Sequence, residues 1–187
     1  MVIDEKEKLR EVKVVPHDKN WSKKYRSEAT KLKHIFADKI HSLHHIGSTA
    51  IAKSSAKPII DIMPLVFSIE DVDTLNSQMA ELGYTALGEY GIPNRRFFYK
   101  DDAKGRAFHL HIFPFENKNA YRHLLFRDYL NNYPDEAESY SSIKKKLATK
   151  HPTDIEAYVI EKSNYIVELF KRIDTSSIAK DYDPLKD

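Results

Sequence analysis

The chain has 187 residues and no cysteine, and its 30 lysines and arginines nearly balance its 28 aspartates and glutamates. This length suits a single domain with its own core, while the lack of cysteine excludes disulfides and zinc-thiolate sites and is typical of a cytoplasmic protein. No apolar run reaches the roughly 18 residues of a membrane span and charges of both signs are interleaved, so we expect no membrane partner and disfavour nucleic acid as a partner.

The first part of the chain is expected to alternate helices and strands. Apolar residues recur at helical spacing in its two helices, and Pro58 bars a regular helix from running into the second strand, which is apolar and β-branched. Gly83 ends the second helix, and a polar turn joins the last two strands as a hairpin. The predicted order is helix 21–39, strand 40–46, strand 59–66, helix 70–82, strand 95–100 and strand 108–113.

The remainder of the chain predicts three amphipathic helices, at residues 119–131, 135–150 and 154–172. Asp135 is expected to cap the second of them, and Thr153 or Asp154 the third. Residues 1–13 and 175–187 are expected to be peripheral. A small mixed sheet with helices packed on it places the chain in the α+β class, as one domain with a helical C-terminal half.

A single carboxylate, Asp61, stands inside the apolar strand of the stretch HHIGSTAIAKSSAKPIIDIMPLV, residues 44–66. Alternation along the strand puts Asp61 on the same face as Met63, so its charge lies at an open end of the sheet or is buried at a cost. One explanation is structural, a hydrogen bond to a helix N-terminus or a pair with Lys57. The other is functional, the binding of a hard divalent metal that bridges the phosphates of a nucleotide.

Two histidines alternate with apolar residues in the strand FHLHIF, so His109 and His111 project to one face. They are either two partly exposed strand histidines or, if Asp61 lies on a neighbouring strand, a metal-ligand pair or a general base. Arg95 and Arg96 face opposite ways on the partner strand, so only one of them can join this surface. A guanidinium there would suit phosphate oxygens.

The segment HLLFRDYL places Arg127 and Asp128 next to each other on a helix, about 100 degrees apart around its axis. Neighbouring charges of this kind are commonly surface residues without a further role. The alternative is that Arg127 points towards the Asp61 cleft and binds a phosphorylated ligand. In that case replacing Arg127 with alanine should weaken ligand binding and leave the melting temperature nearly unchanged.

Several sequence blocks together resemble the GrpB family, in order and spacing, from about residue 14 to residue 173. The blocks are HHIGSTAIAKSSAKPIIDI, LGY, HLHIF, FRDYL, YPDEAESYSSIKKKLA and AYVIEKSNYI. The resemblance implies a nucleotidyltransferase-like fold, in which a Gly-Ser pair on a short helix precedes a metal-binding acidic strand. Some related family members are fused to the enzyme that phosphorylates dephospho-coenzyme A, which suggests nucleotide or cofactor metabolism.

The resemblance assigns the Gly-Ser position to Gly47 and Ser48 and the first catalytic acid to Asp61. A glycine lets a phosphate approach the backbone, and the following turn offers N–H donors. This sequence departs from the superfamily at Met63, where a second acid would stand, because a thioether is a poor ligand for magnesium. It also lacks the Pro-Gly that the family usually shows within the stretch IAKSSAKP, so we expect a more mobile loop.

We therefore expect a protein that binds a nucleotide or phosphorylated small molecule, with divalent-metal-assisted nucleotidyl or phosphoryl transfer if it is an enzyme. The expected metal is Mg²⁺ or Mn²⁺, and the expected catalytic and metal-binding residues are Asp61, His109 and His111. The expected phosphate-binding residues are Gly47, Ser48, Thr49, Lys57 and Arg127. The alternatives are a catalytically inactive nucleotide-sensing or scaffold domain and, disfavoured by the balanced charge, an RNA-modifying transferase.

Overall fold

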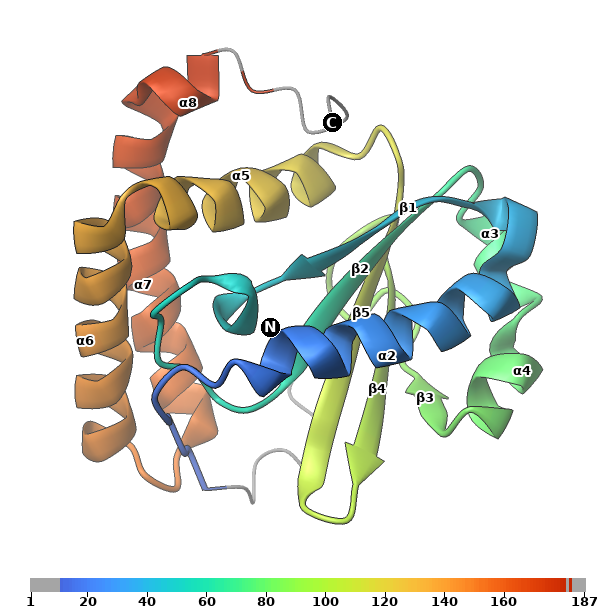
Figure 1. Ribbon diagram of the computed structural model, residues 1–187, viewed down its shortest axis with the longest axis horizontal. Helices are drawn as coiled ribbons and strands as arrows, with labels where there is room; N and C mark the ends of the chain where they lie inside the picture. The colour runs from blue at the N-terminus through green and yellow to red at the C-terminus, as the bar shows by residue number, and fades with distance from the viewer. Residues whose placement is uncertain (1–10, 181, 183–187) are drawn as a thin grey trace.

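The structure is a computed structural model, and it describes residues 11–180 and 182. A five-stranded sheet in the order β1-β2-β5-β4-β3 lies at its centre (Figure 1). Only β2 and β5 pair in parallel, and the other neighbours are antiparallel, so the sheet is mixed. The strands are β1 (Ile40–Ile46), β2 (Ile60–Val66), β3 (Tyr84–Ala86), β4 (Arg96–Asp102) and β5 (Gly105–Pro114).

Helices cover both faces of this sheet, and further helices lie beside one of its edges. The long helix α2 crosses the face turned towards the viewer in Figure 1, and α5, α6 and α7 form a helical half beside β1. The helices are α2 (Asn20–Phe36), α3 (Glu70–Asp73), α4 (Asn76–Glu81), α5 (Lys118–Asn132), α6 (Pro134–Lys150), α7 (Ile155–Thr175) and α8 (Ser177–Lys180), with short 3-10 turns η1 (Ala37–Lys39) and η2 (Ser48–Ala50). The predicted α+β class is confirmed, as are the predicted hairpin and the helical C-terminal half.

Alternation along β2 divides its side chains between two cores. Ile60 and Ile62 pack with Trp21 of α2 in the core on one face. Met63 and Leu65 join the second core, which α5 closes with Ala120 and Leu124. Asp61 alternates with the first pair, so its carboxylate lies on the α5 face of the sheet.

The structure corrects several element boundaries. The helix expected at 70–82 is split into α3 and α4, and the strand β3 that follows was not predicted, because it has only three residues. The helix α6 begins at Pro134, which places Asp135 in its first turn instead of at its cap. Asp154 does cap α7, since its side chain accepts a hydrogen bond of 2.9 Å from the Ala157 N–H.

The described parts of both end segments pack against the protein. Val12 is buried in a core with Tyr158 of α7, and the Tyr182 hydroxyl donates a hydrogen bond of 2.6 Å to Asp128 Oδ2. The expectation was that residues 1–13 and 175–187 are peripheral, and these contacts differ from it. Of these two segments, residues 1–10, 181 and 183–187 lie outside the described part of the chain. Of the helices in the described part of the chain, none combines the length and apolar character needed to cross a membrane.

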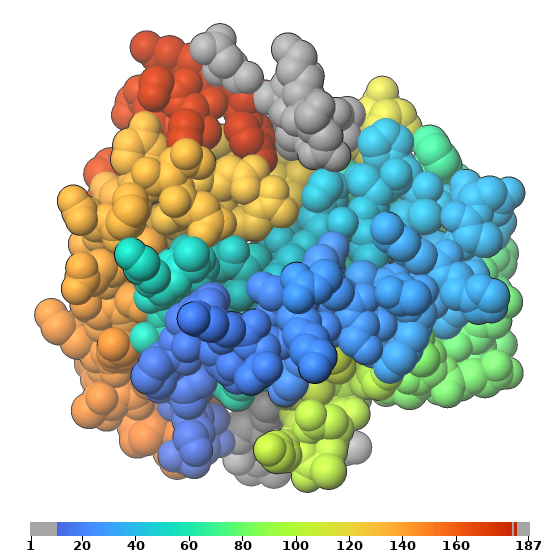
Figure 2. Space-filling model, viewed as in Figure 1, coloured from blue at the N-terminus to red at the C-terminus, as the bar shows by residue number. Residues whose placement is uncertain are grey.

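The connection between β1 and β2 docks onto the helical half. Its residues, coloured teal, lie against α5 and α6 in the space-filling view (Figure 2). The Ala52 N–H donates to Asn131 Oδ1 over 2.8 Å, and the Ser55 N–H donates to Ser141 Oγ over 2.6 Å. Ile51 is buried within the core of the helical half. The turn that begins at Gly47 is therefore fixed between the sheet and the helices.

Candidate functional site

The strand register brings Asp61 beside the two histidines of β5. Asp61 and His109 are paired positions in the parallel ladder, and His111 follows two residues later on the same face. Asp61 Oδ1 lies 3.2 Å from His109 Nδ1 and 3.5 Å from His111 Nε2. The three side chains therefore converge, as the alternation of both strands predicts.

Gly47 closes the other side of the Asp61 carboxylate. A Cβ atom at Gly47 would lie 2.3 Å from Asp61 Oδ2, and the backbone there has φ 68° and ψ −170°. That conformation is open almost only to glycine, so both the backbone and the close approach require this residue. The carboxylate of Asp61 fills the space beside Gly47. The resemblance to the family had led us to expect a phosphate group in this space.

The local environment keeps Asp61 ionised and His111 neutral. Burial opposes ionisation of Asp61, but hydrogen bonds from His109 and His111 outweigh it and hold the pKa of the carboxyl well below its usual range. Burial lowers the pKa of His111, although the Asp61 carboxylate partly offsets this. At neutral pH the site thus combines one carboxylate with a neutral His111 imidazole.

These three residues fit a divalent metal ion. Asp61, His109 and His111 each offer a ligand atom, and the three atoms lie within 4.8 Å of one another. Neighbouring ligands of a tetrahedral ion with bonds of about 2.1 Å stand about 3.4 Å apart, which matches the two distances from Asp61 Oδ1. In His109, Nδ1 is the nitrogen that contacts Asp61. Its other nitrogen, Nε2, is buried and has no hydrogen-bond partner among the described residues.

Arg95 is the member of the Arg95–Arg96 pair that joins this surface. Arg96 lies apart, in a two-pronged ion pair with Asp73 at 2.7 and 2.8 Å. Arg95 is buried, and its Nη1 lies 3.4 Å from His111 Nδ1. Phe97 packs beneath it, with the guanidinium carbon 5.0 Å from the ring centroid. Burial lowers the pKa of Arg95 to about 10, so it remains a cation at neutral pH.

Two further histidines lie near the cluster, His123 on the α5 face of the sheet and His45 on the opposite face against α2, and sequence reasoning missed both. The His123 ring of α5 lies 5.6 Å from that of His111, and burial lowers its pKa to about 3. His45 of β1 stacks on Tyr25 at 4.8 Å, and burial lowers its pKa to about 4. A signal for His123 was available, because it stands four residues before Arg127 and so shares its helix face.

Ser48 connects the turn to a buried polar cluster on α6. Its hydroxyl donates to the Tyr140 hydroxyl over 3.4 Å. The Tyr140 ring lies 4.1 Å from Lys144 Nζ, which in turn donates to Ser54 Oγ over 2.8 Å and to the Ser55 carbonyl. Burial, with a smaller effect from nearby lysines, lowers the pKa of Lys144 to about 6. Sequence reasoning missed Tyr140 and Lys144, because helical spacing alone marks them as core and surface.

The other predicted phosphate-binding residues have partners of their own. The Thr49 hydroxyl is buried, 3.0 Å from His45 Nε2. Lys57 Nζ lies 5.8 Å from the centroid of the Tyr158 ring. Arg127 does not diverge from Asp128 as expected: its Nε and Nη2 donate to that carboxylate over 2.6 and 3.0 Å, and its Nη1 donates to the His45 carbonyl over 3.1 Å. Arg127 therefore connects α5 to the end of β1 by a hydrogen bond, next to the site.

Met63 occupies the position of the missing second acid. Its side chain is fully buried with Ile46, Leu65 and Phe113, so it contributes to the core between the sheet and α5. The group of described residues that could hold a metal contains one carboxylate, Asp61. The arrangement suits a single metal ion more than a pair.

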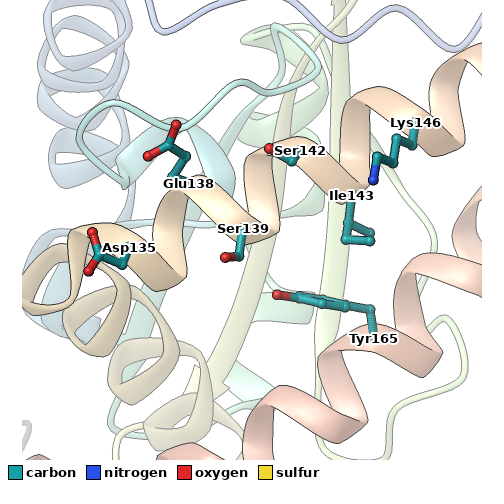
Figure 3. A pocket seen from close by; sticks show the side chains of 7 residues that line it. All are labelled: Asp135, Glu138, Ser139, Ser142, Ile143, Lys146 and Tyr165. Atoms are coloured by element: carbon teal, nitrogen blue, oxygen red, sulfur yellow. The ribbon is translucent and has the colours of Figure 1, made fainter.

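Two hollows of the surface lie away from this cluster. One of about 600 Å³ is a groove between α6 and α7, lined by residues such as Asp135, Glu138 and Tyr165 (Figure 3). Another lies beside α2 and the β4–β5 hairpin and is lined by several lysines together with Glu28. None of the predicted site residues lines either hollow.

Comparison with known proteins gives consistent matches. UPF0157 protein YqkA of Bacillus subtilis (strain 168) is 42% identical over 157 residues, which are 84% of this chain and 46% of that protein. Glutamate-rich protein GrpB of Alkalihalophilus pseudofirmus is 34% identical over 167 residues, and the match covers 87% of this chain and 96% of that protein. The chain thus spans less than half of one relative and nearly all of the other.

A solved structure agrees with these relatives. The crystal structure of conserved protein GrpB from Enterococcus faecalis superposes with a TM-score of 0.82 at 36% identity, over 86% of this chain and 96% of that one. The family model described as GrpB protein matches residues 11–172, which include every residue of the cluster described above. The chain belongs to the GrpB family.

Proposed function

We propose that this chain is a cytoplasmic protein that binds a nucleotide or phosphorylated small molecule through one divalent metal ion. The observation that carries the proposal is the convergence of Asp61, His109 and His111 at the end of β1, beside the glycine turn. Asp61 and the two imidazoles would hold the ion. When bound, such an ion neutralises phosphate charge and orients a phosphoryl group for transfer.

The ligand set favours Mn²⁺ over Mg²⁺. Magnesium prefers a shell of oxygen atoms, whereas imidazole nitrogens suit first-row transition metals. Because burial lowers the pKa of His111, the ring is a neutral imidazole at neutral pH, the form that can bind a metal. Of the two metals expected from the sequence, manganese is therefore the better candidate.

The Ser48 turn and its surroundings would receive the phosphate. Ser48 is partly exposed and carries a hydroxyl on the 3-10 turn that follows Gly47. Arg127 lies on the α5 side, at the end of β1, and would bind a phosphate in exchange for its ion pair with Asp128. Thr49 and Lys57 contribute less in this arrangement, because Thr49 is buried in a hydrogen bond and Lys57 lies over the Tyr158 ring.

A second candidate is a nucleotide-sensing domain without catalytic activity. Met63 favours it, because the position of the second acid is filled by a buried core residue. In that case the protein binds the same ligand and metal but does not transfer a phosphoryl or nucleotidyl group. The two candidates share a binding site and differ in turnover.

Calorimetric titration of Mn²⁺ into the wild type and Asp61→Asn tests the metal site. We expect Asp61→Asn to weaken binding roughly 100-fold or more, since a lost ligand should cost at least as much as a lost outer-shell partner. Asp38→Asn, which changes an exposed aspartate of η1, is the matched control and should bind like the wild type. Equal Mn²⁺ affinity in all three proteins would refute the site.

A thermal-shift series with ATP and with dephospho-coenzyme A, each with and without Mn²⁺, tests the ligand. A metal-dependent rise in melting temperature in the wild type, absent in Asp61→Asn, supports the proposal. Product analysis of the same mixtures then separates the two candidates. Transfer that depends on Asp61 identifies an enzyme, and binding without product identifies the sensing domain.

A further inference from the structure

Arg95 links the candidate metal site to a loop on its rim. Its Nη1 lies 3.4 Å from His111 Nδ1, while its Nε donates to the Glu89 carbonyl over 3.2 Å and its Nη2 to the Tyr90 carbonyl over 2.7 Å. It is buried between this loop and the sheet, with Phe97 beneath its guanidinium. One side chain therefore contacts a candidate metal ligand and two carbonyls of the loop.

The contact with Arg95 determines which nitrogen of His111 carries the proton. A guanidinium has only donors, so His111 Nδ1 must be the acceptor. In a neutral imidazole the other nitrogen then bears the proton, and that nitrogen, Nε2, lies 3.5 Å from Asp61 Oδ1. Arg95 therefore favours the His111 tautomer that donates to the carboxylate.

This tautomer opposes metal binding through Nε2. A metal-bound Nε2 has no proton, so the proton moves to Nδ1, which in metal sites usually donates to a carboxylate or carbonyl oxygen. Here Nδ1 faces Arg95, which accepts no hydrogen bond. The present Arg95–His111 contact and a metal–His111 bond thus exclude each other.

The loop held by Arg95 contains backbone conformations that are costly for these residues. Tyr90 has φ 46° and Asn94 has φ 60°, and a positive φ at a bulky residue such as tyrosine is uncommon. The Tyr90 ring stacks on Phe97 at 4.9 Å, and Phe97 in turn contacts the ring of His111 at 5.1 Å. The hydrogen bonds from Arg95 to the loop carbonyls stabilise this conformation.

We infer that Arg95 is a positioning residue that holds His111 in its metal-free tautomer, so that metal binding releases Arg95 and with it the loop of residues 88–94. The inference rests on the metal site of the proposed function. Arg95 then sets the metal affinity and couples occupancy of the site to the loop beside it.

Arg95→Met tests the inference, because methionine retains an apolar stem over Phe97 and removes every donor. We expect it to bind Mn²⁺ about tenfold more tightly than the wild type, in the range of other outer-shell changes. Arg96→Met is the matched control, since Arg96 pairs with Asp73 and contacts the backbone carbonyl of Arg95 rather than its guanidinium, and it should bind Mn²⁺ like the wild type. Weaker or unchanged Mn²⁺ binding in Arg95→Met overturns the inference.

Two readouts are independent of metal affinity. Nitrogen-15 NMR of the metal-free wild type should show the His111 proton on Nε2, and Arg95→Met should show a mixture of tautomers. In hydrogen exchange, Mn²⁺ should speed exchange of the amides of residues 88–94 in the wild type, whereas Arg95→Met should exchange fast with or without metal. A proton on Nδ1 in the wild type, or a loop that ignores the metal, contradicts the inference.

Arg95→Lys provides a second variant if Arg95→Met does not fold. Lysine keeps the charge but cannot donate to His111 and to both loop carbonyls at once, so it should shift Mn²⁺ affinity in the same direction by a smaller factor. A wild type that binds no Mn²⁺ overturns both the metal site and its coupling to the loop. The NMR result still decides the tautomer role of Arg95, so the two failures are distinguishable.

Discussion

Replacing Gly47 with alanine would place a methyl group against the carboxylate of Asp61. The new Cβ would stand 2.3 Å from Oδ2 and 3.0 Å from Cγ, so the Asp61 side chain must move. The backbone conformation, which is nearly restricted to glycine, costs about 1–3 kcal/mol for alanine. Overpacking at a filled position adds about 1–3 kcal/mol, so we expect Gly47→Ala to lower the free energy of unfolding by about 2–6 kcal/mol.

Gly88→Ala separates the two contributions. Gly88 also has a positive φ, of 59°, but a Cβ there would meet no atom within 4 Å, so only the backbone cost of about 1–2 kcal/mol applies. Urea denaturation of both variants measures the difference, and each kcal/mol should lower the melting temperature by about 2–4 °C. Equal losses of stability in the two variants would refute the steric argument at Gly47.

Two other substitutions test the surroundings of the site. Because burial lowers the pKa of Lys144 to about 6, below its unfolded value near 10.4, the unfolded state gains the proton first as pH falls. As pH falls from about 10 to about 6, the free energy of unfolding of the wild type should therefore decrease relative to that of Lys144→Met, by at most about 1.4 kcal/mol per pH unit. Free energies of unfolding that change with pH in the same way in both proteins would exclude this. Arg127→Met should lower the free energy of unfolding by about 1–3 kcal/mol in urea denaturation, because it removes hydrogen bonds to Asp128 and the His45 carbonyl. This expected loss of stability replaces the earlier expectation that removing Arg127 leaves the melting temperature nearly unchanged. An unchanged unfolding midpoint would mean that the hydrogen bonds of Arg127 do not contribute to stability.

The strands that carry Asp61 and His109 were predictable, the first from its apolar, β-branched run and the second from its alternation of histidines with apolar residues. Their convergence needed only that the two strands be neighbours. The contacts of Arg95 were less predictable, since Gly88, Gly91 and Asn94 mark a turn but do not indicate that Tyr90 also takes a positive φ or that its carbonyl faces Arg95.

Buried polar contacts between distant segments were the least predictable. Lys144 reads as a solvated helix lysine, and only the docking of the β1–β2 connection onto α6 gives it Ser54 and Ser55 as partners. The split between α3 and α4 was missed for a related reason, since their apolar spacing continues through the break. Periodicity identifies the faces of an element, but not which loop covers a face.

The β1–β2 connection inserts Ile51 into the core of the helical half while both of its ends continue into strands of the sheet. Separating the helices from the sheet would expose Ile51 and pull on two adjoining strands at once. The described chain should therefore unfold in a single cooperative transition, with no stage in which the helical half has detached. Ser48 lies on this connection, so a ligand that orders it should protect amides in α6 from hydrogen exchange as well as those near the ligand.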